Sequence, residues 1–338
     1  MNPYFLRRVT SLIPVLLLVL VLIFALARFI PGDPAVALLG PGATAEQIEA
    51  LRGQMRLERS VPIQFLSSLS DLAHGDLGRS FRTGRPVFND LLIKFPATLE
   101  LSSLALVIAV VFGIPMGVLS AIKPHSLFDH ATRLVSLLGV SMPAFLLALL
   151  VQNIFGVYLR WLPVSGRTSP YLLPHPVTGF AILDGIISGD GLAAWDAFCH
   201  LILPSAVLAA FLAATLARFI RNTMIEVMSE DYIRTARAKG LLDSAVIVRH
   251  GLRNSLLPAL TVIGLQFAEL LSGAILTETI FALPGIGRFM FDAIRNRDYP
   301  VIQGTVLAFA LLFSMVSLTV DLLHGLLDPR IRKKMVDG

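Results

Sequence analysis

The stretch SEDYIRTARAKGLLDSAVIVRHGLRN, Ser229 to Asn254, is a polar island in an otherwise apolar chain. It carries five of the 28 Lys and Arg residues, and long apolar runs flank it on both sides. A basic segment between two membrane spans stays on the cytoplasmic side. The island therefore predicts a membrane protein, and it marks the place where that protein would meet a soluble partner.

The rest of the chain fits an all-α integral membrane protein. Of its 338 residues, 55% are apolar, and the mean hydropathy is +0.75, whereas soluble domains are about 45–50% apolar. At about 20 residues per crossing, the apolar runs predict six transmembrane helices. The predicted spans are roughly 9–30, 97–122, 134–158, 199–220, 256–280 and 302–324. The first apolar run, from Val9 to Ala27, is long for a signal-peptide core, so we expect a retained span.

Positive charge gives the predicted orientation. With the N-terminus inside, the cytoplasmic parts hold 15 Lys and Arg residues and the two short outer loops hold five. The inner set is Arg7, Arg8, Lys123, Arg133, Arg218, Arg221, Arg234, Arg237, Lys239, Arg249, Arg253, Arg330, Arg332, Lys333 and Lys334; the outer set is Arg160, Arg167, Arg288, Arg295 and Arg297. Both termini are therefore predicted to be cytoplasmic. Because the net charge of +5 comes from residues beside spans, nucleic acid is not an expected partner.

This topology leaves one large outer segment, residues 31–95. Thr44 and Gln47 form a capping-box pair, which predicts a helix through about Leu57. Val61 to Ala73 predicts a second, amphipathic helix, so we expect a small extracytoplasmic cap. The predicted domains are the first span (1–30), the cap (31–95), the transmembrane core (96–325, including a cytoplasmic loop at 221–255) and a cytoplasmic tail (326–338).

Motifs of the common enzyme classes are absent from the sequence. There is no GxxxxGK[ST] loop, no HExxH and no GxSxG. His125 and His130 lack the further ligands that a metal site needs, and the single cysteine, Cys199, excludes an internal disulfide. We therefore expect no catalytic residue, no metal and no cofactor on this chain.

Within the island, residues 231–240 form an amphipathic pattern on a helix that Gly240 would end. Its polar edge is Asp231, Arg234 and Arg237, and its narrow apolar edge is Ile233 and Ala236 with Tyr232 alongside. A second helix is predicted from about Ser244 to Asn254. Helices this short are marginal in water. Two interpretations remain: a docking element, or a solvated loop whose arginines only fix the topology.

The fifth predicted span carries a polar stripe. Gln266, Glu269, Gly273 and Thr277 are spaced by three, four and four residues, which places them on one helical face. Ionised Glu269 at mid-bilayer would cost about 2.5–3.5 kcal/mol, so it should face protein or water. The favoured interpretation is a translocation path for a polar or cationic solute; the alternative is burial against another span. Glu278 and Arg288, farther along, are predicted to shape an outer gate or a docking surface.

Several short motifs occur in an order that resembles permeases of ATP-binding-cassette importers of the dipeptide/oligopeptide/nickel branch. They are IPGDP (Ile30 to Pro34), GDLGRS (Gly75 to Ser80), FPATLELS (Phe95 to Ser102), SMPAF (Ser141 to Phe145), PVSGR (Pro163 to Arg167), DYIRTARAKGL (Asp231 to Leu241), LRNSLLP (Leu252 to Pro258), LTETIFALPGIGR (Leu276 to Arg288) and RDYPVIQG (Arg297 to Gly304). PVSGR and PVTGF (Pro176 to Phe180) resemble the dipeptide-type member most. One departure is the absence of the Glu that opens the general importer signature; Arg234 occupies that position.

The resemblance implies a type I importer permease in a bacterial inner membrane. It implies a coupling helix that docks on an ATPase subunit, formed by Asp231, Tyr232, Arg234, Thr235, Ala236, Arg237, Ala238, Lys239 and Gly240. The implied partners are a second homologous permease, two ATP-binding subunits that carry ATP and Mg, a periplasmic or lipid-anchored solute-binding protein, membrane lipid and a peptide-like substrate.

Two other classes of function are open at this stage. An ion-coupled secondary transporter would use Glu269 or Asp321 to carry protons. An intramembrane hydrolase would need a nucleophile and a base, and no such motif is present. The sequence does not name the solute, because permeases that resemble this chain handle dipeptides, oligopeptides, glutathione, nickel chelates or haem.

Overall fold

The computed structural model describes residues 3–29, 34–39, 42–54 and 58–327. Its elements are α1 (Pro3–Phe29), α2 (Pro34–Leu39), α3 (Ala45–Gln54), α4 (Val61–Ala73), α5 (Val87–Ile122), α6 (Leu127–Ser141), α7 (Ala144–Val151), η1 (Gln152–Tyr158), α8 (Ala181–Ile187), α9 (Gly191–Ser229), α10 (Asp231–Ala238), α11 (Asp243–Ala245), η2 (Val246–Leu252), α12 (Arg253–Gly273), α13 (Ile275–Ile280), α14 (Ile286–Arg295) and α15 (Tyr299–Leu327). Two of these, η1 and η2, are π-helical. Within the described ranges the only β pairing is an isolated bridge between Arg79 and Pro86, so the all-α prediction is confirmed.

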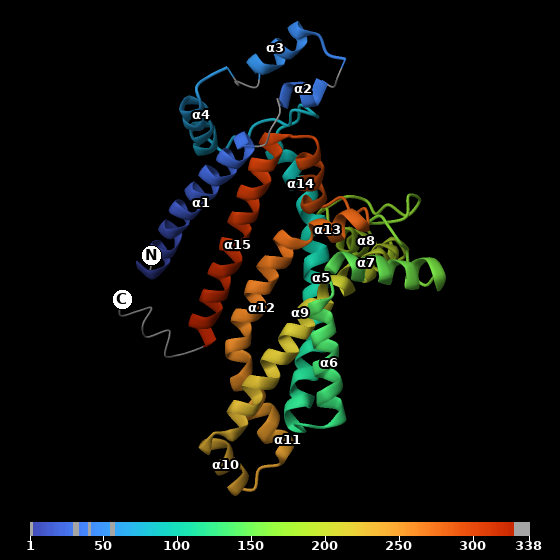
Figure 1. Cartoon of the computed structure of the whole chain (residues 1–338). Helices are drawn as coiled ribbons and strands as arrows, with labels where there is room; N and C mark the ends of the chain where they lie inside the picture. Colours follow the sequence, from blue (N-terminus) through green and yellow to red (C-terminus); the bar gives the residue numbers. More distant parts are fainter. Residues whose placement is uncertain (1–2, 30–33, 40–41, 55–57, 328–338) are drawn as a thin grey trace.

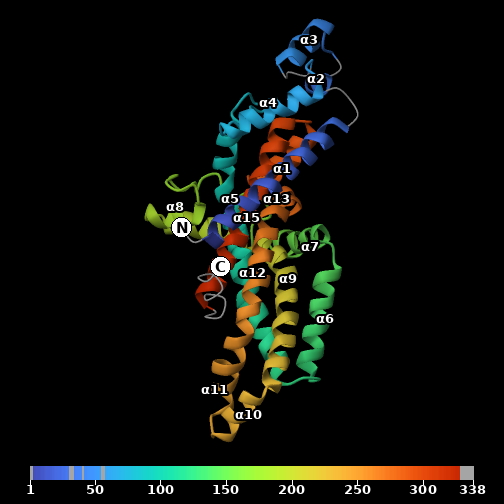
Figure 2. The same cartoon turned by 90° about the vertical axis from the view of Figure 1, so that its left-hand side faces the viewer.

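The molecule is an elongated bundle with different ends (Figures 1 and 2). Helices α2 to α4 lie at one end, α10 and α11 lie at the other, and α5, α9, α12 and α15 run between them. Among the described residues, four helices are long and apolar enough to cross a membrane, and a sharply bent pair would make a fifth. In α1 the corresponding apolar part, Ile13–Leu26, is shorter.

The predicted third span, 134–158, is not one continuous helix. Helix α6 ends at Ser141, and α7 with η1 leaves it at an angle of 106°. The break lies at Met142, whose backbone is extended (φ −83°, ψ 127°). Pro143 follows, and a residue that precedes proline avoids the helical region because its backbone clashes with the proline ring. The prediction of a single helix over 134–158 is therefore wrong, because the break at Met142 divides this region into two helical parts.

The contact between α5 and α9 depends on two small residues. A Cβ added to Gly113 would lie 2.9 Å from the carbonyl oxygen of Ala213, and one added to Gly117 would lie 2.7 Å from that of Ala217. Glycines spaced by four residues let helix backbones approach closely, which is a common way to pack helices in a membrane. This contact holds the first long helix of the core against the helix that leads to the polar island.

The two predicted cap helices are present. The capping box is confirmed. The backbone N–H of Gln47 donates to Thr44 Oγ1 (3.3 Å), and the backbone N–H of Thr44 donates to Gln47 Oε1 (3.0 Å). Helix α4 has the predicted bounds. The predicted helix end near Leu57, residues 30–33 of the IPGDP motif and residues 328–338 of the predicted tail lie outside the described residues.

Candidate functional site

Helix α10 and the turn that ends it form a compact element, residues 231–240, which we call the elbow. Glu230 is extended (φ −68°, ψ 149°) and separates α10 from α9. Gly240 has φ +76°, a left-handed conformation that glycine adopts without steric cost. Its amide donates to the Arg237 carbonyl at 2.9 Å. The helix and its glycine end were both predicted correctly.

The apolar edge of the elbow is buried against the chain itself. Ile233 and Ala236 pack with Val246 of η2, and Met228 of α9 lies against this cluster. Tyr232 is partly exposed, and its hydroxyl accepts a hydrogen bond from Asn254 Nδ2 (2.8 Å). Packing against other parts of the same chain therefore stabilises the short helix. A partner protein would contact the faces that this packing leaves exposed.

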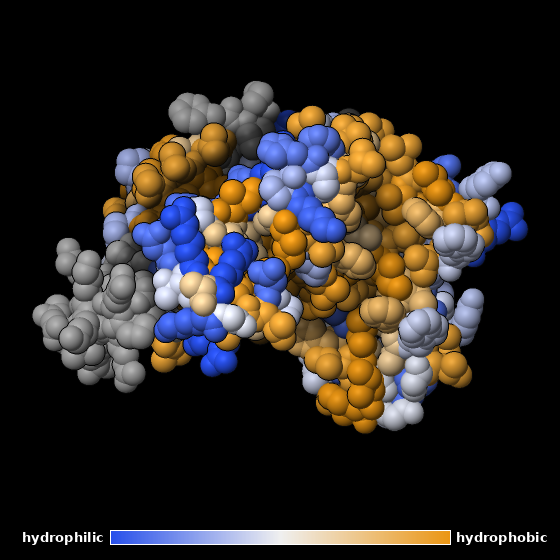
Figure 3. Space-filling model, turned by 90° about the horizontal axis from the view of Figure 1, so that it is seen from below, coloured by the Kyte–Doolittle hydropathy of each residue, from blue (hydrophilic) through white to orange (hydrophobic). Residues whose placement is uncertain are grey.

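Those other faces are polar and exposed. The exposed residues of the elbow include Asp231, Arg234, Thr235, Arg237, Ala238 and Lys239. Two pairs of charges meet there: Arg234 Nη1 lies 3.4 Å from Asp231 Oδ1, and Arg237 Nε lies 3.3 Å from Asp243 Oδ1. Exposed pairs of this kind contribute little to folding, so these charges are available to a binding partner. Figure 3 looks onto this end and shows a hydrophilic patch bordered by apolar side chains.

Sequence reasoning missed the apolar side chains next to the elbow. Leu242 is 76% exposed, and Leu241 and Val248 are exposed as well. Apolar side chains grouped at an otherwise polar, solvent-facing end indicate an interaction surface. A signal was present, since two adjacent leucines directly follow the helix-ending glycine.

The polar stripe of the fifth predicted span is interrupted. Gln266 and Glu269 lie on α12, which ends at Gly273, and Glu269 is exposed. Thr277 lies on the separate short helix α13, after a break at Ala274, and its side chain is buried. The prediction of one continuous helical face through Thr277 is therefore wrong. The surroundings of Gly273 lie outside what the structure describes.

Glu278 is enclosed rather than presented to solvent. Its carboxylate accepts from Thr98 Oγ1 (2.6 Å) and from the backbone amide of Arg288 (2.9 Å). Gly285 makes room for it, because a Cβ there would overlap the Glu278 carboxylate. Glu278 thus fixes the start of α14 on α5. It does not itself form a docking surface in this structure, contrary to one of the two predicted roles, and the half-buried Arg288 contributes its backbone to the contact.

Two further carboxylates, those of Glu100 and Asp298, are also buried, and the sequence analysis did not single them out. Glu100 accepts from Arg167 Nη2 (2.6 Å) and from the amide of Ile182 (2.8 Å). Asp298 accepts from Ser80 Oγ (2.6 Å) and from the amides of Phe81 (3.1 Å) and Arg82 (3.3 Å). We call Glu100, Glu278, Asp298 and their donors the outer junction, after the side of the membrane on which the sequence predicts them to lie. It ties α5 and the segments before it to α8, α13, α14 and the start of α15.

Comparison with known proteins gives the class of this molecule. The family model described as "binding-protein-dependent transport system inner membrane component" matches residues 113–333, and the model of the N-terminal part of such membrane components matches residues 1–102. The chain belongs to this family. The resemblance to ATP-binding-cassette importer permeases is therefore confirmed.

Relatives of this permease match it along nearly its whole length. It is 47% identical over 328 residues to the di/tripeptide transport system permease protein DppB of Pseudomonas aeruginosa (96% of this chain, 97% of the relative). It is 44% identical over 338 residues to the dipeptide transport system permease protein DppB of Escherichia coli K12 (99% and 100%). It is 40% identical over 331 residues to the glutathione transport system permease protein GsiC of Pectobacterium atrosepticum (98% and 99%).

Family membership fixes the general role. The chain is the permease component of an importer in the inner membrane, and it works with another permease, ATPase components and a solute-binding component. It is a transport subunit rather than an enzyme, because ATP hydrolysis belongs to the partner subunits.

Proposed function

We propose that this permease forms half of the path by which dipeptides or related short peptides enter the cell, driven by ATP hydrolysis on separate chains. The observation that carries the proposal is the elbow: a short helix folded onto its own chain, with its charges turned outward and a glycine-defined exit. The peptide substrate is proposed because relatives are named as dipeptide and di/tripeptide permeases.

The proposed topology has six spans: α1, α5, the bent pair α6 and α7–η1, α9, α12 and α15. In Figure 1 the start of α1 and the end of α15 both lie at the ends of these helices that are farther from the cap. This arrangement supports two termini on the same side of the membrane, which we propose to be the cytoplasmic side. The cap (31–95) would lie outside, the core would be 96–325 with the cytoplasmic loop at 221–255, and the tail at 326–338 would be cytoplasmic. The charge asymmetry supports the same orientation.

The proposed complex contains this chain, a second homologous permease, two ATP-binding subunits, and a periplasmic or lipid-anchored binding protein. ATP and Mg would be held by the ATP-binding subunits and not by this chain. The elbow would dock on one of them through residues 231–240. Because it joins α9 to α12 through η2, a push on the elbow would move both long helices, which is the physical basis for alternating access.

Gln266 and Glu269 are proposed as part of the translocation path, with Gly273 at the end of the same helix. An exposed carboxylate on a long apolar helix is costly against lipid, so it should face water or a partner subunit. A carboxylate in a water-filled path would attract the ammonium group of a peptide. We propose that Thr277, Glu278 and Arg288 do not line this path. Instead they would hold α13 and α14 in place at its outer end.

The decisive test is uptake of a labelled dipeptide by cells that express the complete transporter, with the proton gradient collapsed by an ionophore and ATP maintained. We expect uptake to continue. Uptake that stops when the gradient collapses, although ATP remains, would support the ion-coupled alternative and overturn the proposal.

A further inference from the structure

Several charges converge on the carboxylate of Asp129, which lies in the first turn of α6 and is fully buried. Its oxygens accept two hydrogen bonds from Arg221 of α9 (2.6 Å from Nε and 2.9 Å from Nη2). They accept two more from Arg133 of α6 (3.2 Å from Nε and 2.6 Å from Nη2) and one from the backbone N–H of His125 (2.9 Å). Hydrogen bonds between ionised groups are the strong ones, so this carboxylate is tightly held. We call Asp129, Arg133 and Arg221 the Asp129 cluster.

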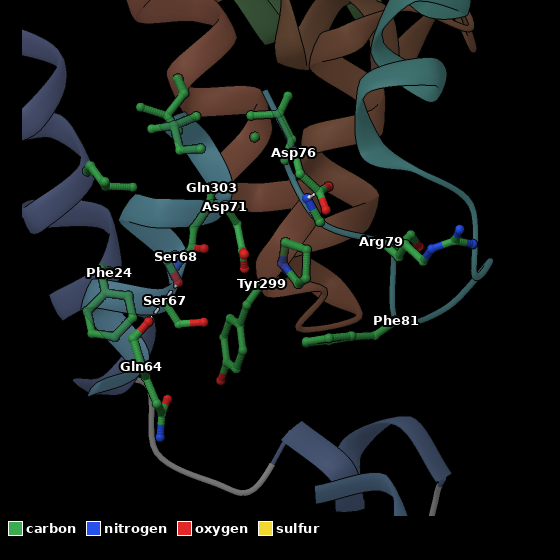
Figure 4. A pocket seen from close by; sticks show the side chains of 18 of the residues that line it. Phe24, Gln64, Ser67, Ser68, Asp71, Asp76, Arg79, Phe81, Tyr299 and Gln303 are labelled. Atoms are coloured by element: carbon green, nitrogen blue, oxygen red, sulfur yellow. Dashed lines mark hydrogen bonds between the residues drawn. The ribbon is translucent and has the colours of Figure 1, made fainter. Parts of the chain in front are cut away.

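A cavity at the opposite end of the molecule lacks such convergence. It has a volume of about 570 Å³ and lies between α1, α4, the turn at residues 76–84 and the start of α15 (Figure 4). Arg79, one of its lining residues, extends away from the cavity, and its Nη1 donates to the Gly84 carbonyl (3.2 Å). The Asp129 cluster, by contrast, joins two long segments of the bundle, and its role follows from which segments these are.

The cluster lies where α9 leads into the elbow. Arg221 is about two turns before the end of α9 at Ser229, and the elbow begins at Asp231. Backbone hydrogen bonds between successive turns make a helix stiff, so a displacement of the elbow moves Arg221 as well. Two N–H···O bonds from one guanidinium fix both the distance and the orientation of the carboxylate. Asp129 would therefore follow Arg221.

Helix α6 is the element that Asp129 would carry along. Arg133 and the backbone N–H of His125 bind the same carboxylate, so the start of α6 and the turn before it form one body with Asp129. Farther along, α6 touches α9 at Gly139, where an added Cβ would lie 3.5 Å from the carbonyl oxygen of Ala210. A contact without a large side chain resists sliding only weakly. The ion pair between Asp129 and Arg221 supplies the resistance that this contact lacks.

A displacement of α6 would reach farther elements. Helix α6 leads through the bend at Met142 into α7 and η1. Gln152 of η1 donates from Nε2 to the Val164 carbonyl (2.7 Å), so η1 is attached to the segment that follows it. The Asp129 cluster is thus the first link between the elbow and this part of the permease.

We propose that Asp129 and Arg221 are positioning residues for transport: their ion pair makes α6 move together with the elbow end of α9 when the partner subunits hydrolyse ATP. The inference rests on the docking role proposed for the elbow. It adds α6 to the helices that the elbow drives, which in the proposed function are α9 and α12.

The test measures the distance between α6 and α9 in the complete transporter in lipid nanodiscs. Spin labels are attached at Leu134→Cys on α6 and Glu226→Cys on α9, both exposed positions. Cys199→Ser removes the single cysteine of this chain, and the other subunits are made free of cysteine. Pulsed electron paramagnetic resonance gives the distance distribution without nucleotide and after trapping with ATP and vanadate. We expect the two distributions to coincide, because the ion pair keeps the two helices together.

Arg221→Met and Arg133→Met form a matched pair of variants. Each removes two hydrogen bonds to Asp129 and leaves the carboxylate paired with the other arginine, so neither leaves a buried charge alone. Only Arg221→Met cuts the link between α6 and α9. In this variant we expect the distance distributions of the two nucleotide states to differ. We also expect the amount of dipeptide transported per ATP hydrolysed to fall about tenfold, the effect of one lost charge-assisted hydrogen bond. Arg133→Met should match the wild type in both measurements.

The outcomes separate this inference from the proposed function. Distributions that differ between the two states without the Arg221 substitution, or that coincide in Arg221→Met, would overturn the inference even if ATP-driven dipeptide uptake is normal. An equal loss of transport per ATP in Arg221→Met and Arg133→Met would also overturn it, because it would show a role in stability alone. Distance distributions as expected, with no ATP-driven dipeptide uptake by the wild type, would support the link between α6 and α9 and contradict the proposed function.

Discussion

In the outer junction, the carboxylates of Glu100, Glu278 and Asp298 are buried, and each accepts at least one backbone amide and one side-chain donor. In the elbow, by contrast, the charges of Asp231, Arg234 and Arg237 are exposed and only loosely paired. Buried carboxylates must find their donors within the chain, because water cannot supply them. The junction is therefore complete in itself, whereas the charges of the elbow stay exposed, as the docking role proposed for it requires.

The largest expected effect lies in the outer junction. Asp298→Ala would leave the hydroxyl of Ser80 and the amides of Phe81 and Arg82 without their acceptor, at a cost of about 3 kcal/mol. We expect a clearly lower midpoint of thermal unfolding for the purified transporter. Asp298→Asn keeps one acceptor oxygen, so its unfolding midpoint should lie between those of Asp298→Ala and the wild type. A wild-type midpoint for Asp298→Ala would mean that the junction does not stabilise the fold.

The next effect concerns the exit of the elbow. Gly240→Val places a β-branched residue at φ +76°, where each such residue is strained by about 1–2 kcal/mol. The turn should rearrange, so dipeptide transport should fall at least about tenfold while membrane insertion and ATP hydrolysis persist. Transport assays in proteoliposomes, run beside ATPase assays, measure the two activities separately.

Gly240→Asn is the matched control for this change, because asparagine tolerates the left-handed conformation better than valine. It should retain most of the transport. Normal transport by Gly240→Val would show that the exit angle of the elbow does not couple the two activities.

A smaller effect is expected from the apolar side chain beside the elbow. Leu242→Ala removes an exposed leucine, and burying a leucine in an interface is worth about 1.5–3 kcal/mol. We expect affinity for the ATPase subunit to fall about tenfold. Leu192→Ala, at a similarly exposed leucine (73%) on the first turn of α9, should not change that affinity. Equal binding by the Leu242 variant and the wild type would exclude Leu242 from the interface.

The smallest effect comes from Asp184 of α8, close to Glu100. Burial opposes its ionisation, but donors from Thr178 and Gly179 outweigh burial and hold the pKa of Asp184 below its ordinary value of 3.8. A carboxyl with a lowered folded pKa stabilises the fold above pH 3.8, and this contribution is lost as the pH falls through the folded pKa.

Asp184→Asn should lower the stability by about 1 kcal/mol near neutral pH. The difference in stability between Asp184→Asn and the wild type should become smaller below about pH 4. Unfolding midpoints of both proteins, measured from pH 6 to pH 3, would show this. A difference independent of pH would contradict this account.

Sequence patterns located the elbow well because its features are local. The spacing of Ile233 and Ala236 and the position of Gly240 predicted a short helix with a narrow apolar edge and a defined end. The structure has both, and it buries the apolar edge against Val246. The bend after α6 shows the limit of such patterns. Pro143 breaks its helix, yet Pro115, Pro204 and Pro258 lie inside continuous helices. Since all are prolines in apolar runs, the packing around each one decides the outcome.

The sequence by itself determined the helical class, the short helix of the elbow and the two helices α3 and α4, because these depend on composition and on neighbours three or four residues apart. Only the tertiary structure decided that the polar stripe stops at Ala274 and that Glu278 is enclosed by α5 and α14. It also joined Ser80 to Asp298 across 218 positions of the chain. A buried carboxylate is stabilised by whichever donors the fold brings to it, and those donors come from segments that local patterns do not connect.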